Sequence, residues 1–484
     1  MVARRQPQEA WALGLKPRRA TRKTQGRDRD GARQGARAHA EPPGLAVRKT
    51  AASILRQVIE RGVPLDALTD EAHGGEHFRG LDPRDRSLVR AILGAALRRR
   101  GEIHAALARC LDRPLPLHSG ALAAILHVGA AQILFLDVPD HAAVSLAVAH
   151  AWSDRTARNA RGLVNSVLRR IARERDDILA RPDAARLNAP DWLFRRWSEA
   201  YGEALADRIA EEHLIPPGLD LSIRADPELW AERLGGVALP TGTVRLPEAR
   251  RVSALPGYAE GAWWVQDAAA ALPARLLGDV AGKSVADLCA APGGKTAELA
   301  SSGAAVTAVD VSTSRLKRLS ANLERLRLKA EIVTADVLAW APGRTFDAVL
   351  LDAPCSSTGT IRRHPDVAWL KRPEDIATLA GLQTKMLDRA AAWVAPGGLL
   401  IFCTCSLERE EGEAQVAPFL ARHPDFAPAP VQPGELAGLA HLISPSGALR
   451  TLPFHRFGPD LIPPHTSDTM RGMDGFFAAR FRRL

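Results

Sequence analysis

Apolar residues recur at helical spacing through the first third of the chain. Between residues 45 and 180, side chains three and four positions apart form stripes that would each cover one face of a helix. Two of the clearest stripes are Val47, Ala51, Ile54, Leu55 and Val58, and Leu163, Val164, Val167, Leu168 and Ile171. The alternation typical of a half-buried strand is absent here. We therefore expect an all-α domain of six or seven helices over residues 43–182.

One apolar run, residues 121–136, raises the question of a membrane span. A spanning helix needs roughly 20 apolar residues, and this run is shorter and contains His127 and Gln132. We expect it to form a buried helix instead.

From residue 283 the pattern alternates short apolar runs with amphipathic segments. The runs at 284–289, 304–309, 331–334, 346–351 and 399–402 predict strands. Ser312 is a candidate N-cap for a helix with an apolar stripe at Leu316, Leu319 and Leu323, and Pro373 suits the first turn of a later helix. Alternating strands and helices predict a Rossmann-like α/β domain over residues 281–484, with a doubly wound, mostly parallel sheet.

The stretch between these two parts has a different character. Residues 183–280 are interrupted by prolines such as Pro190 and Pro216, and Leu219–Ile223 is a short strand-like run. We expect a small α+β connecting subdomain, so the fold class is multidomain: all-α, then α+β, then α/β.

Composition and charge narrow the class of protein. Hydrophobic residues make up 46% and charged residues 25%, which excludes a collagen, a coiled coil or wholesale disorder. Residues 1–40 carry +8 of the net charge of +10, with almost no large apolar residues. We expect residues 1–42 to form a basic disordered tail, which could also serve as a non-specific nucleic-acid arm. The N-terminus lacks the apolar run of a secretory signal, so we expect a cytoplasmic protein.

Cysteine usage points to chemistry rather than to cross-links. The chain has five cysteines, too few for a disulfide scaffold, and no C-x-x-C pair that would favour a structural zinc site. We expect no metal. Four of the five fall within 117 residues of the predicted α/β domain: Cys289, Cys355, Cys403 and Cys405.

The loop after the first predicted strand allows two interpretations. It is a near miss of the P-loop motif, with a cysteine where the first glycine belongs, which would suit a nucleotidase. Alternatively it is a cofactor loop, since Asp310 closes the second strand, where a carboxylate would meet a ribose hydroxyl. The full set of polar strand ends favours an adenosine-bearing cofactor. The loop consists of Cys289, Ala290, Ala291, Pro292, Gly293, Gly294 and Lys295.

Two thiols follow neighbouring predicted strands. Cys355 closes the Asp-Ala-Pro-Cys sequence that begins at Asp352, and Cys405 follows the fifth strand. Most cysteines are simply small buried residues, which we expect of Cys110 and Cys403. Two thiols at one cofactor site favour covalent chemistry instead. C5 of cytosine is a poor nucleophile, and a thiolate adding at C6 would turn it into an enamine that can accept a methyl group.

These residues resemble the RNA cytosine-C5 methyltransferases that use S-adenosylmethionine. Within them, the chain resembles the Sun/Fmu family of bacterial small-subunit (16S) ribosomal RNA methyltransferases, over about residues 45–484. Residues 138–144 and 162–170 are similar to the antitermination factor NusB, which identifies the helical part as a NusB-like, RNA-binding domain. Residues 266–267, 361–366 and 474–477 also match the family. The basic tail is not part of the family pattern.

The resemblance implies a role for each site residue. Residues 289–295 would line the methionine end of the cofactor, Asp310 its ribose with Arg315 nearby, and Asp336 its adenine. Asp352 would contact both the cofactor side and the cytosine ring. Cys405 would be the nucleophile and Cys355 would assist product release, a choice that spacing alone leaves open.

The loop after Cys355 carries three further basic residues. Charged loops often merely face solvent, but this one lies at the active edge of the predicted sheet. Arg362, Arg363 and His364 are therefore candidate contacts for RNA phosphates.

Three functions remain open at this point. The resemblance favours methylation of 16S ribosomal RNA by a monomeric enzyme with no membrane partner. A transfer-RNA cytosine-C5 methyltransferase with the same core is the second. A non-catalytic RNA-binding or antitermination protein is the third, and the intact thiols and cofactor loop argue against it.

Overall fold

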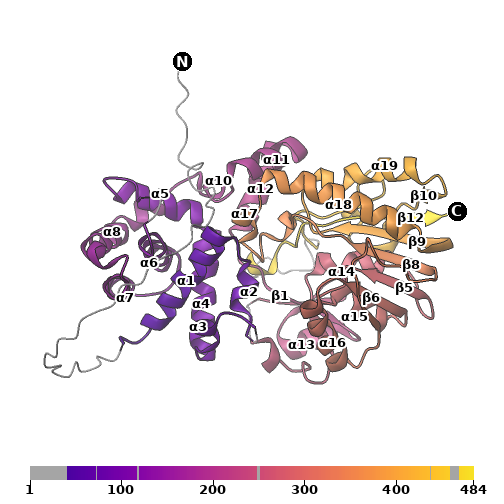
Figure 1. Cartoon of the computed structure of the whole chain (residues 1–484), viewed down its shortest axis with the longest axis horizontal. Coiled ribbons are helices and arrows are strands. Elements are labelled where there is room, and N and C mark those ends of the chain that lie inside the picture. The colour runs from indigo at the N-terminus through magenta and orange to yellow at the C-terminus, as the bar shows by residue number, and fades with distance from the viewer. Residues whose placement is uncertain (1–40, 72, 117–118, 248–250, 437, 458–467) are drawn as a thin grey trace, which may run out of the picture. The chain divides into compact units, whose positions relative to one another are not determined.

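The computed structural model describes residues 41–484 except 72, 117–118, 248–250, 437 and 458–467 (Figure 1). The predicted tail therefore lies outside the described residues, apart from its last two. The chain divides into two compact units, Met1–Pro182 and Asp183–Leu484.

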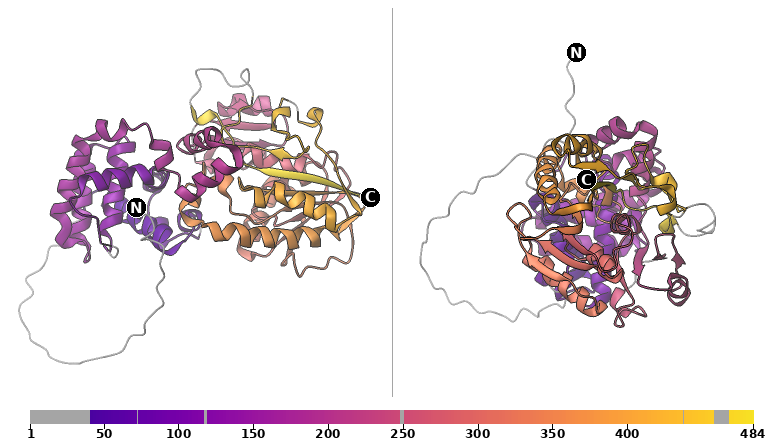
Figure 2. Two further views of the ribbon diagram at one scale, coloured as in Figure 1. Left: turned by 90° about the horizontal axis from the view of Figure 1, so that it is seen from above. Right: turned by 90° about the vertical axis from the view of Figure 1, so that its right-hand side faces the viewer.

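The first unit is built from helices alone in its described part, as the left view in Figure 2 shows. Its described part has nine α-helices, more than the six or seven predicted, and six of them are longer than ten residues. They are α1 (Leu45–Arg61), α4 (Pro83–Arg98), α5 (Arg100–Cys110), α6 (Leu122–Phe135), α7 (Asp140–Ser153) and α8 (Arg161–Arg173). Shorter helices are α2 (Leu65–Thr69), α3 (Glu76–Arg79) and α9 (Arg175–Leu179).

Helix α6 forms the centre of this unit. Nearly all its side chains are buried, and it contacts α1, α4, α5, α7 and α8. Its one buried amide is satisfied, because Gln132 accepts from Arg48 Nε at 2.8 Å and donates to the Val128 carbonyl at 2.8 Å. Burial lowers the pKa of His127 to about 3, so this side chain is neutral. The run at 121–136 is thus a buried core helix, as predicted, and across the described residues we find no helix long and apolar enough to cross a membrane.

The second unit begins with helices and a small antiparallel sheet. Helices α10 (Ala184–Leu187), α11 (Asp191–Tyr201) and α12 (Glu203–His213) precede four strands in the order β2-β3-β1-β4. The strands are β1 (Leu219–Ile223), β2 (Val237–Ala238), β3 (Thr243–Leu246) and β4 (Trp263–Val265), with α13 (Pro227–Leu234) after β1. Residues 183–280, which the sequence separates from the α/β domain, belong to the same compact unit.

A larger sheet of eight strands organises the rest of the unit. Its main order is β10-β12-β9-β8-β5-β6-β7, and β11 pairs with β12. The parallel strands are β5 (Ser284–Leu288), β6 (Ala305–Asp310), β7 (Glu331–Thr334), β8 (Phe346–Asp352) and β9 (Val394–Thr404). The antiparallel ones are β10 (Phe426–Pro428), β11 (Leu449–Arg450) and β12 (Phe477–Arg483). The predicted mostly parallel, doubly wound sheet is confirmed.

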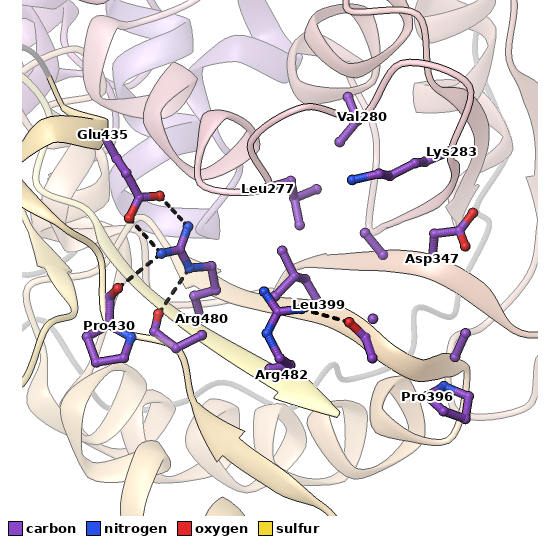
Figure 3. A pocket seen from close by; sticks show the side chains of 15 residues that line it. Leu277, Val280, Lys283, Asp347, Pro396, Leu399, Pro430, Glu435, Arg480 and Arg482 are labelled. Atoms are coloured by element: carbon purple, nitrogen blue, oxygen red, sulfur yellow. Dashed lines mark hydrogen bonds and ion pairs between the residues drawn. The ribbon is translucent and has the colours of Figure 1, made fainter. Parts of the chain in front are cut away.

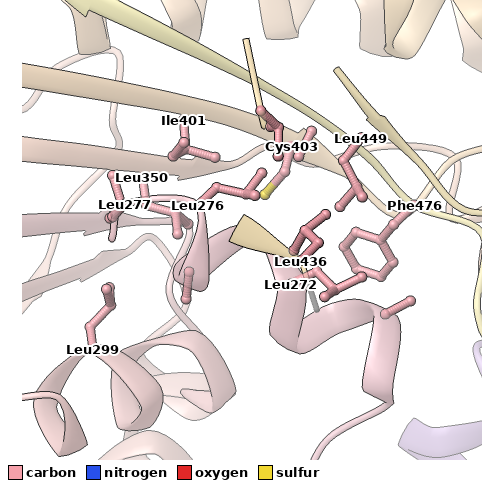
Figure 4. Close-up of a cluster of buried hydrophobic side chains, with 14 of the residues drawn as sticks. Leu272, Leu276, Leu277, Leu299, Leu350, Ile401, Cys403, Leu436, Leu449 and Phe476 are labelled. Carbon is pink, nitrogen blue, oxygen red and sulfur yellow. The ribbon is translucent and has the colours of Figure 1, made fainter. Parts of the chain in front are cut away.

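Helices cover both faces of the large sheet. Helices α18 (Pro373–Ala391) and α19 (Glu413–Arg422) pack on one face around Met386, Leu387 and Phe419. On the other face lie α14 (Ala268–Arg275), α15 (Gly294–Ser301) and α16 (Thr313–Leu326) (Figure 1). Figure 4 shows part of the core on that second face, to which Leu272 and Leu299 of the helices and Leu350 and Ile401 of the strands belong.

Two helix starts follow from local sequence signals. The Ser312 hydroxyl accepts from the Arg315 amide at 3.4 Å, so Ser312 is the N-cap of α16. Pro373 occupies the first turn of α18, where no amide hydrogen is needed. Both positions agree with the sequence-based prediction.

Candidate active site

The sheet brings five strand ends to one edge. The chain runs from β5 outward to β7 and then returns to β8 and β9 on the other side of β5. In such doubly wound sheets, ligands bind beyond the carboxyl ends of the strands at this switch point. Each of the five strands ends in a residue or loop that the sequence singled out.

The loop after β5 has a backbone that only certain residues tolerate. Cys289 and Gly293 both have positive φ, at 60° and 104°. A Cβ on Gly293 would lie 2.8 Å from Leu319 Cγ, so glycine is required where the loop passes α16. The loop then turns into α15, whose first-turn amides have no partner inside the helix and suit an anionic group.

Asp310 ties this loop to the start of α16. Its Oδ2 accepts from the Ala291 amide at 3.1 Å, and its Oδ1 accepts from the Ser312 amide at 2.9 Å. Arg315 lies 3.5 Å from the same carboxylate and also donates to the Ala291 carbonyl. Each carboxylate oxygen has a second lone pair, so Asp310 can still accept from ribose hydroxyls.

Asp336 follows β7, beside the end of β6. Its Oδ1 accepts from the Leu338 amide at 2.9 Å, and its side chain is exposed. An exposed carboxylate next to Asp310 fits the amino group of an adenine.

Lys295 and Asp352 form an ion pair at the centre of this edge. Lys295 Nζ donates to Asp352 Oδ2 at 2.8 Å, and Cys403 Sγ lies 3.5 Å from Asp352 Oδ1. Burial lowers the pKa of Lys295, but Asp352 and the other acidic neighbours outweigh it and hold the pKa above its ordinary value. Lys295 is therefore a permanent cation between the cofactor loop and the thiols.

The two thiols meet at the ends of β8 and β9. Cys355 Sγ lies 3.4 Å from Cys405 Sγ, and both cysteines are free and partly exposed. The Ser357 hydroxyl lies 3.5 Å from Cys405 Sγ and 3.9 Å from Cys355 Sγ. The sequence predicted this meeting, because adjacent parallel strands end side by side.

The surroundings shift the pKa values of the two thiols in opposite directions. The hydrogen bond from Cys355 lowers the pKa of Cys405 against the effect of burial, and Ser357 and Lys295 act in the same direction. The same hydrogen bond, burial and nearby negative charge raise the pKa of Cys355. Cys405 is thus the thiol that ionises first, and thiolate is the nucleophilic form.

The remaining cysteines are not placed for this chemistry. Cys403 is fully buried in the sheet core, and burial and Asp352 raise its pKa. Cys110 is buried in the helical unit. Burial also raises the pKa of Cys289, whose backbone conformation shapes the cofactor loop. Among the described residues, no three His, Cys, Asp or Glu side chains gather in a way that could hold a metal ion.

The expectation that all three basic residues after Cys355 contact RNA phosphates is wrong for Arg362. Arg362 is 1% exposed, pairs with the buried Asp267 at 3.1 Å and donates to the Arg471 carbonyl, so it braces the fold and is not available to RNA phosphates. Arg363 pairs with Asp474 at 2.5 Å but keeps a third of its side chain exposed. His364 is partly exposed. Of these three loop residues, Arg363 and His364 are the ones with surface that could meet RNA.

Sequence reasoning missed a set of polar residues that support the thiol loops. Ser356 and Ser406, which follow the two cysteines, both donate to the buried Glu411, and so does Gln383 of α18. The only available signal was the serine directly after each cysteine.

A cavity of about 570 Å³ lies at the other end of the large sheet (Figure 3). Its lining includes Lys283 before β5, Asp347 at the start of β8 and Gly398 early in β9. These are the amino ends of the parallel strands, so this cavity is separate from the thiol edge.

The fold and this edge define a Rossmann-like methyltransferase domain joined to a helical domain. Residues 274–482 match the family described as 16S rRNA methyltransferase RsmB/F, and residues 45–173 match the NusB family. The solved structure of the protein PH0851 superposes with a TM-score of 0.68 at 23% identity, covering 92% of this chain and all of that one, which supports the fold.

Curated relatives give the same result over most of the chain. A ribosomal RNA small subunit methyltransferase B from Vibrio cholerae serotype O1 is 37% identical over 410 residues, covering 81% of this chain and 93% of that protein. The protein of the same name from Xylella fastidiosa strain Temecula1 is 37% identical over 458 residues, covering 90% and 98%. The chain therefore belongs to the RsmB/F methyltransferase family, and its cofactor is S-adenosylmethionine.

Proposed function

We propose that the protein transfers a methyl group to C5 of a cytosine in small-subunit ribosomal RNA, through a covalent bond between Cys405 and C6. The observation that carries this proposal is the thiol pair at the ends of β8 and β9, in which Cys405 has the lowered pKa. The choice of RNA rests on the names of the relatives, which are small-subunit methyltransferases.

The cofactor site is proposed from the same edge of the sheet. The first turn of α15 and Lys295 would hold the methionine end, Asp310 with Arg315 the ribose, and Asp336 the adenine. When bound, S-adenosylmethionine supplies an electrophilic methyl group.

Cys405 performs the first step in this scheme. Its thiolate adds to C6, so a carbon–sulfur bond forms and the ring electrons move to make C5 nucleophilic. Asp352, whose carboxylate accepts from Lys295 Nζ at 2.8 Å at the end of β8, would stabilise the polar edge of the ring. The target base has to leave its stack to reach the thiol.

Product release breaks the C6–sulfur bond that the first step formed. After C5 has taken the methyl group, its proton leaves to water, the C6–sulfur bond breaks, and Cys405 departs as a thiolate. The thiol of Cys355, 3.4 Å away, can donate a hydrogen bond to the departing sulfur and so favours its release.

Bisulfite sequencing tests the proposed substrate. RNA from a strain that lacks this gene should lose one 5-methylcytosine signal in the small-subunit ribosomal RNA, and expression of the wild-type gene should restore it. Loss of a signal in a transfer RNA instead, with ribosomal RNA unchanged, would refute the ribosomal assignment.

A further inference from the structure

One buried carboxylate joins the two thiol loops. Glu411 ends the short turn Arg409–Glu411 and is fully buried. Its Oε1 accepts from the Ser356 amide at 2.9 Å, and its Oε2 accepts from the Ser406 hydroxyl at 2.5 Å and from the Ser356 hydroxyl. Because each serine directly follows a thiol, the carboxylate bridges the two loops one residue behind the sulfurs.

Further hydrogen bonds fix this bridge to the sheet and to α18. Gln383 Nε2 donates to Glu411 at 3.2 Å and to the Pro354 carbonyl at 2.9 Å. The Thr404 hydroxyl donates to the Glu411 carbonyl at 2.8 Å. Both the side chain and the backbone of Glu411 thus restrain the segments that carry the thiols.

Among the described residues, Glu411 has no cation beside it. Within the described chain no lysine, arginine or histidine lies within ion-pair distance of this carboxylate, which is held by hydrogen-bond donors alone. An uncompensated buried charge acts strongly on its neighbours because the interior screens it poorly. Its influence reaches Cys355, whose pKa is raised by the hydrogen bond to Cys405, by burial and also by the nearby Glu411.

We propose that Glu411 is a positioning residue that determines which of the two thiols carries the proton. Its hydrogen bonds hold the Cys355 loop against the Cys405 loop, and its charge keeps Cys355 in the thiol form. Cys405 is then free to ionise, with the Cys355 S–H donating to it. This assignment rests on the proposed function, in which Cys405 is the nucleophile.

The other charged groups around the pair do not reproduce this asymmetry. Asp352 raises the pKa of Cys405 and Lys295 lowers it. The guanidinium of Arg363 also interacts with Cys405. Glu411 acts on the other thiol, because it helps to raise the pKa of Cys355.

Alkylation of the free protein tests this inference without RNA or cofactor. Both thiols are partly exposed, so iodoacetamide should reach them, and peptide mass spectrometry can follow each rate against pH. In the wild type Cys405 should react first and with the lower apparent pKa. In Glu411→Gln, which keeps the shape but loses the charge, the ratio of the Cys405 rate to the Cys355 rate should fall about tenfold, the effect of one pKa unit.

Two further variants separate charge from tethering. Glu408→Gln removes another buried carboxylate of the same segment, one that binds Arg196 and Thr358, and should leave the ratio unchanged. Ser406→Ala removes a tether but keeps the charge, so the ratio should persist while methyl transfer falls. A normal ratio in folded Glu411→Gln would overturn the proposal, and so would a collapsed ratio in Ser406→Ala, even if Glu411→Gln failed to fold.

The outcomes also distinguish this inference from the proposed function. Ordered alkylation in a protein that methylates no cytosine would refute the proposed function alone. Methylation of the expected RNA together with unordered alkylation in the wild type would refute the role of Glu411 alone.

Discussion

At the scale of single residues, the two thiols differ in their environments rather than in their exposure. The hydrogen bond between the two sulfurs lowers the pKa of Cys405 and raises that of Cys355, which also lies near Glu411. If Cys405 forms the adduct and Cys355 assists its breakdown, the two cysteine variants should fail at different steps.

Cys405→Ala should be inactive and should never become linked to RNA, because no C6–sulfur bond can form. Cys355→Ala should still add and methylate but release slowly, so a protein–RNA species should survive denaturing electrophoresis when cofactor is present. The double variant should resemble Cys405→Ala, since the nucleophile acts first. Cys110→Ala is the matched control and should turn over normally. Trapping in Cys405→Ala instead would mean that the two roles are exchanged.

Asp287 offers a test of the site's electrostatics by pH. Burial, together with Asp352 and Asp310, raises its pKa to about 7 against the hydrogen bond from Thr296. The folded protein therefore holds a proton that the unfolded chain releases above about pH 4, and this group's contribution to stability declines as the pH rises from about 4 to 7.

Asp287→Asn mimics the protonated form and should escape this loss. Its free energy of unfolding relative to the wild type should rise by up to about 1.4 kcal/mol for each pH unit in that window. Urea unfolding at several pH values measures the difference. Asp347→Asn is a control that should show no such slope between about pH 4 and 7, because hydrogen bonds from Ser284 lower the pKa of Asp347 and confine its pH dependence to below about pH 4. Parallel pH profiles for wild type and Asp287→Asn would show that Asp287 ionises normally.

One physical reason explains why the sequence alone could not predict the roles of Glu411 and Arg362. Residues 408–413 contain four acidic side chains, and neither spacing nor composition indicates that Glu411 points inward while Glu410 stays exposed. Arg362 looked like a phosphate ligand for the same reason, since its buried partner Asp267 is 95 residues away in the chain. Partners that lie far apart in sequence leave no local pattern.

At the scale of elements, the parallel strands were predictable and the antiparallel edge was not. Strands β5, β6, β8 and β9 contain buried apolar runs between helices, which is a strong local signal, whereas β7 at the end of the sheet is mostly exposed. Strand β12 reads FAARFRR, in which arginines interrupt the apolar pattern, and its place beside β9 depends on pairing across more than 70 residues. The carboxyl ends that form the site belong to the predictable strands.

An exposed aromatic ring in the helical unit presents a further element to test. Trp152 at the end of α7 is 54% exposed, with the guanidinium of Arg161 4.3 Å and that of Arg158 5.8 Å from its ring centroid. Asp154 accepts from the Thr156 and Ala157 amides and so fixes the turn between them. In the part of the chain that the structure describes, neither arginine pairs with a carboxylate. A ring flanked by two guanidinium groups suits stacking on an unpaired RNA base.

Trp152→Ala should therefore weaken binding of single-stranded RNA by about 1–3 kcal/mol, the contribution of one stacked base. Binding of duplex RNA should change far less, because its bases are not free to stack. Fluorescence anisotropy with the two labelled RNAs measures both. Leu179→Ala, at another exposed apolar position of the same unit, should bind like the wild type. Equal losses for single-stranded and duplex RNA would contradict stacking.

At the scale of the whole molecule, most of the net positive charge and the candidate active-site residues lie in different parts of the chain. The thiols, Asp352 and the cofactor loop all lie in the unit Asp183–Leu484. Residues 1–40 hold +8 of the net +10, which leaves only +2 for the remaining 444 residues. General attraction to a polyanion is therefore expected from the tail, and selection of the target base from the folded units.

Removal of residues 1–40 should separate affinity from specificity. The truncated protein should bind RNA more weakly at low salt, and the slope of log affinity against log salt should decrease by about 0.7 for each phosphate of single-stranded RNA that the tail would have neutralised. The methylated position should not change, because tail charges bind phosphates and carry no base information. A full-length variant with the tail sequence shuffled but its charge kept should behave like the wild type. An unchanged salt slope after truncation, or a shifted methylation position with the shuffled tail, would show that the tail acts in another way.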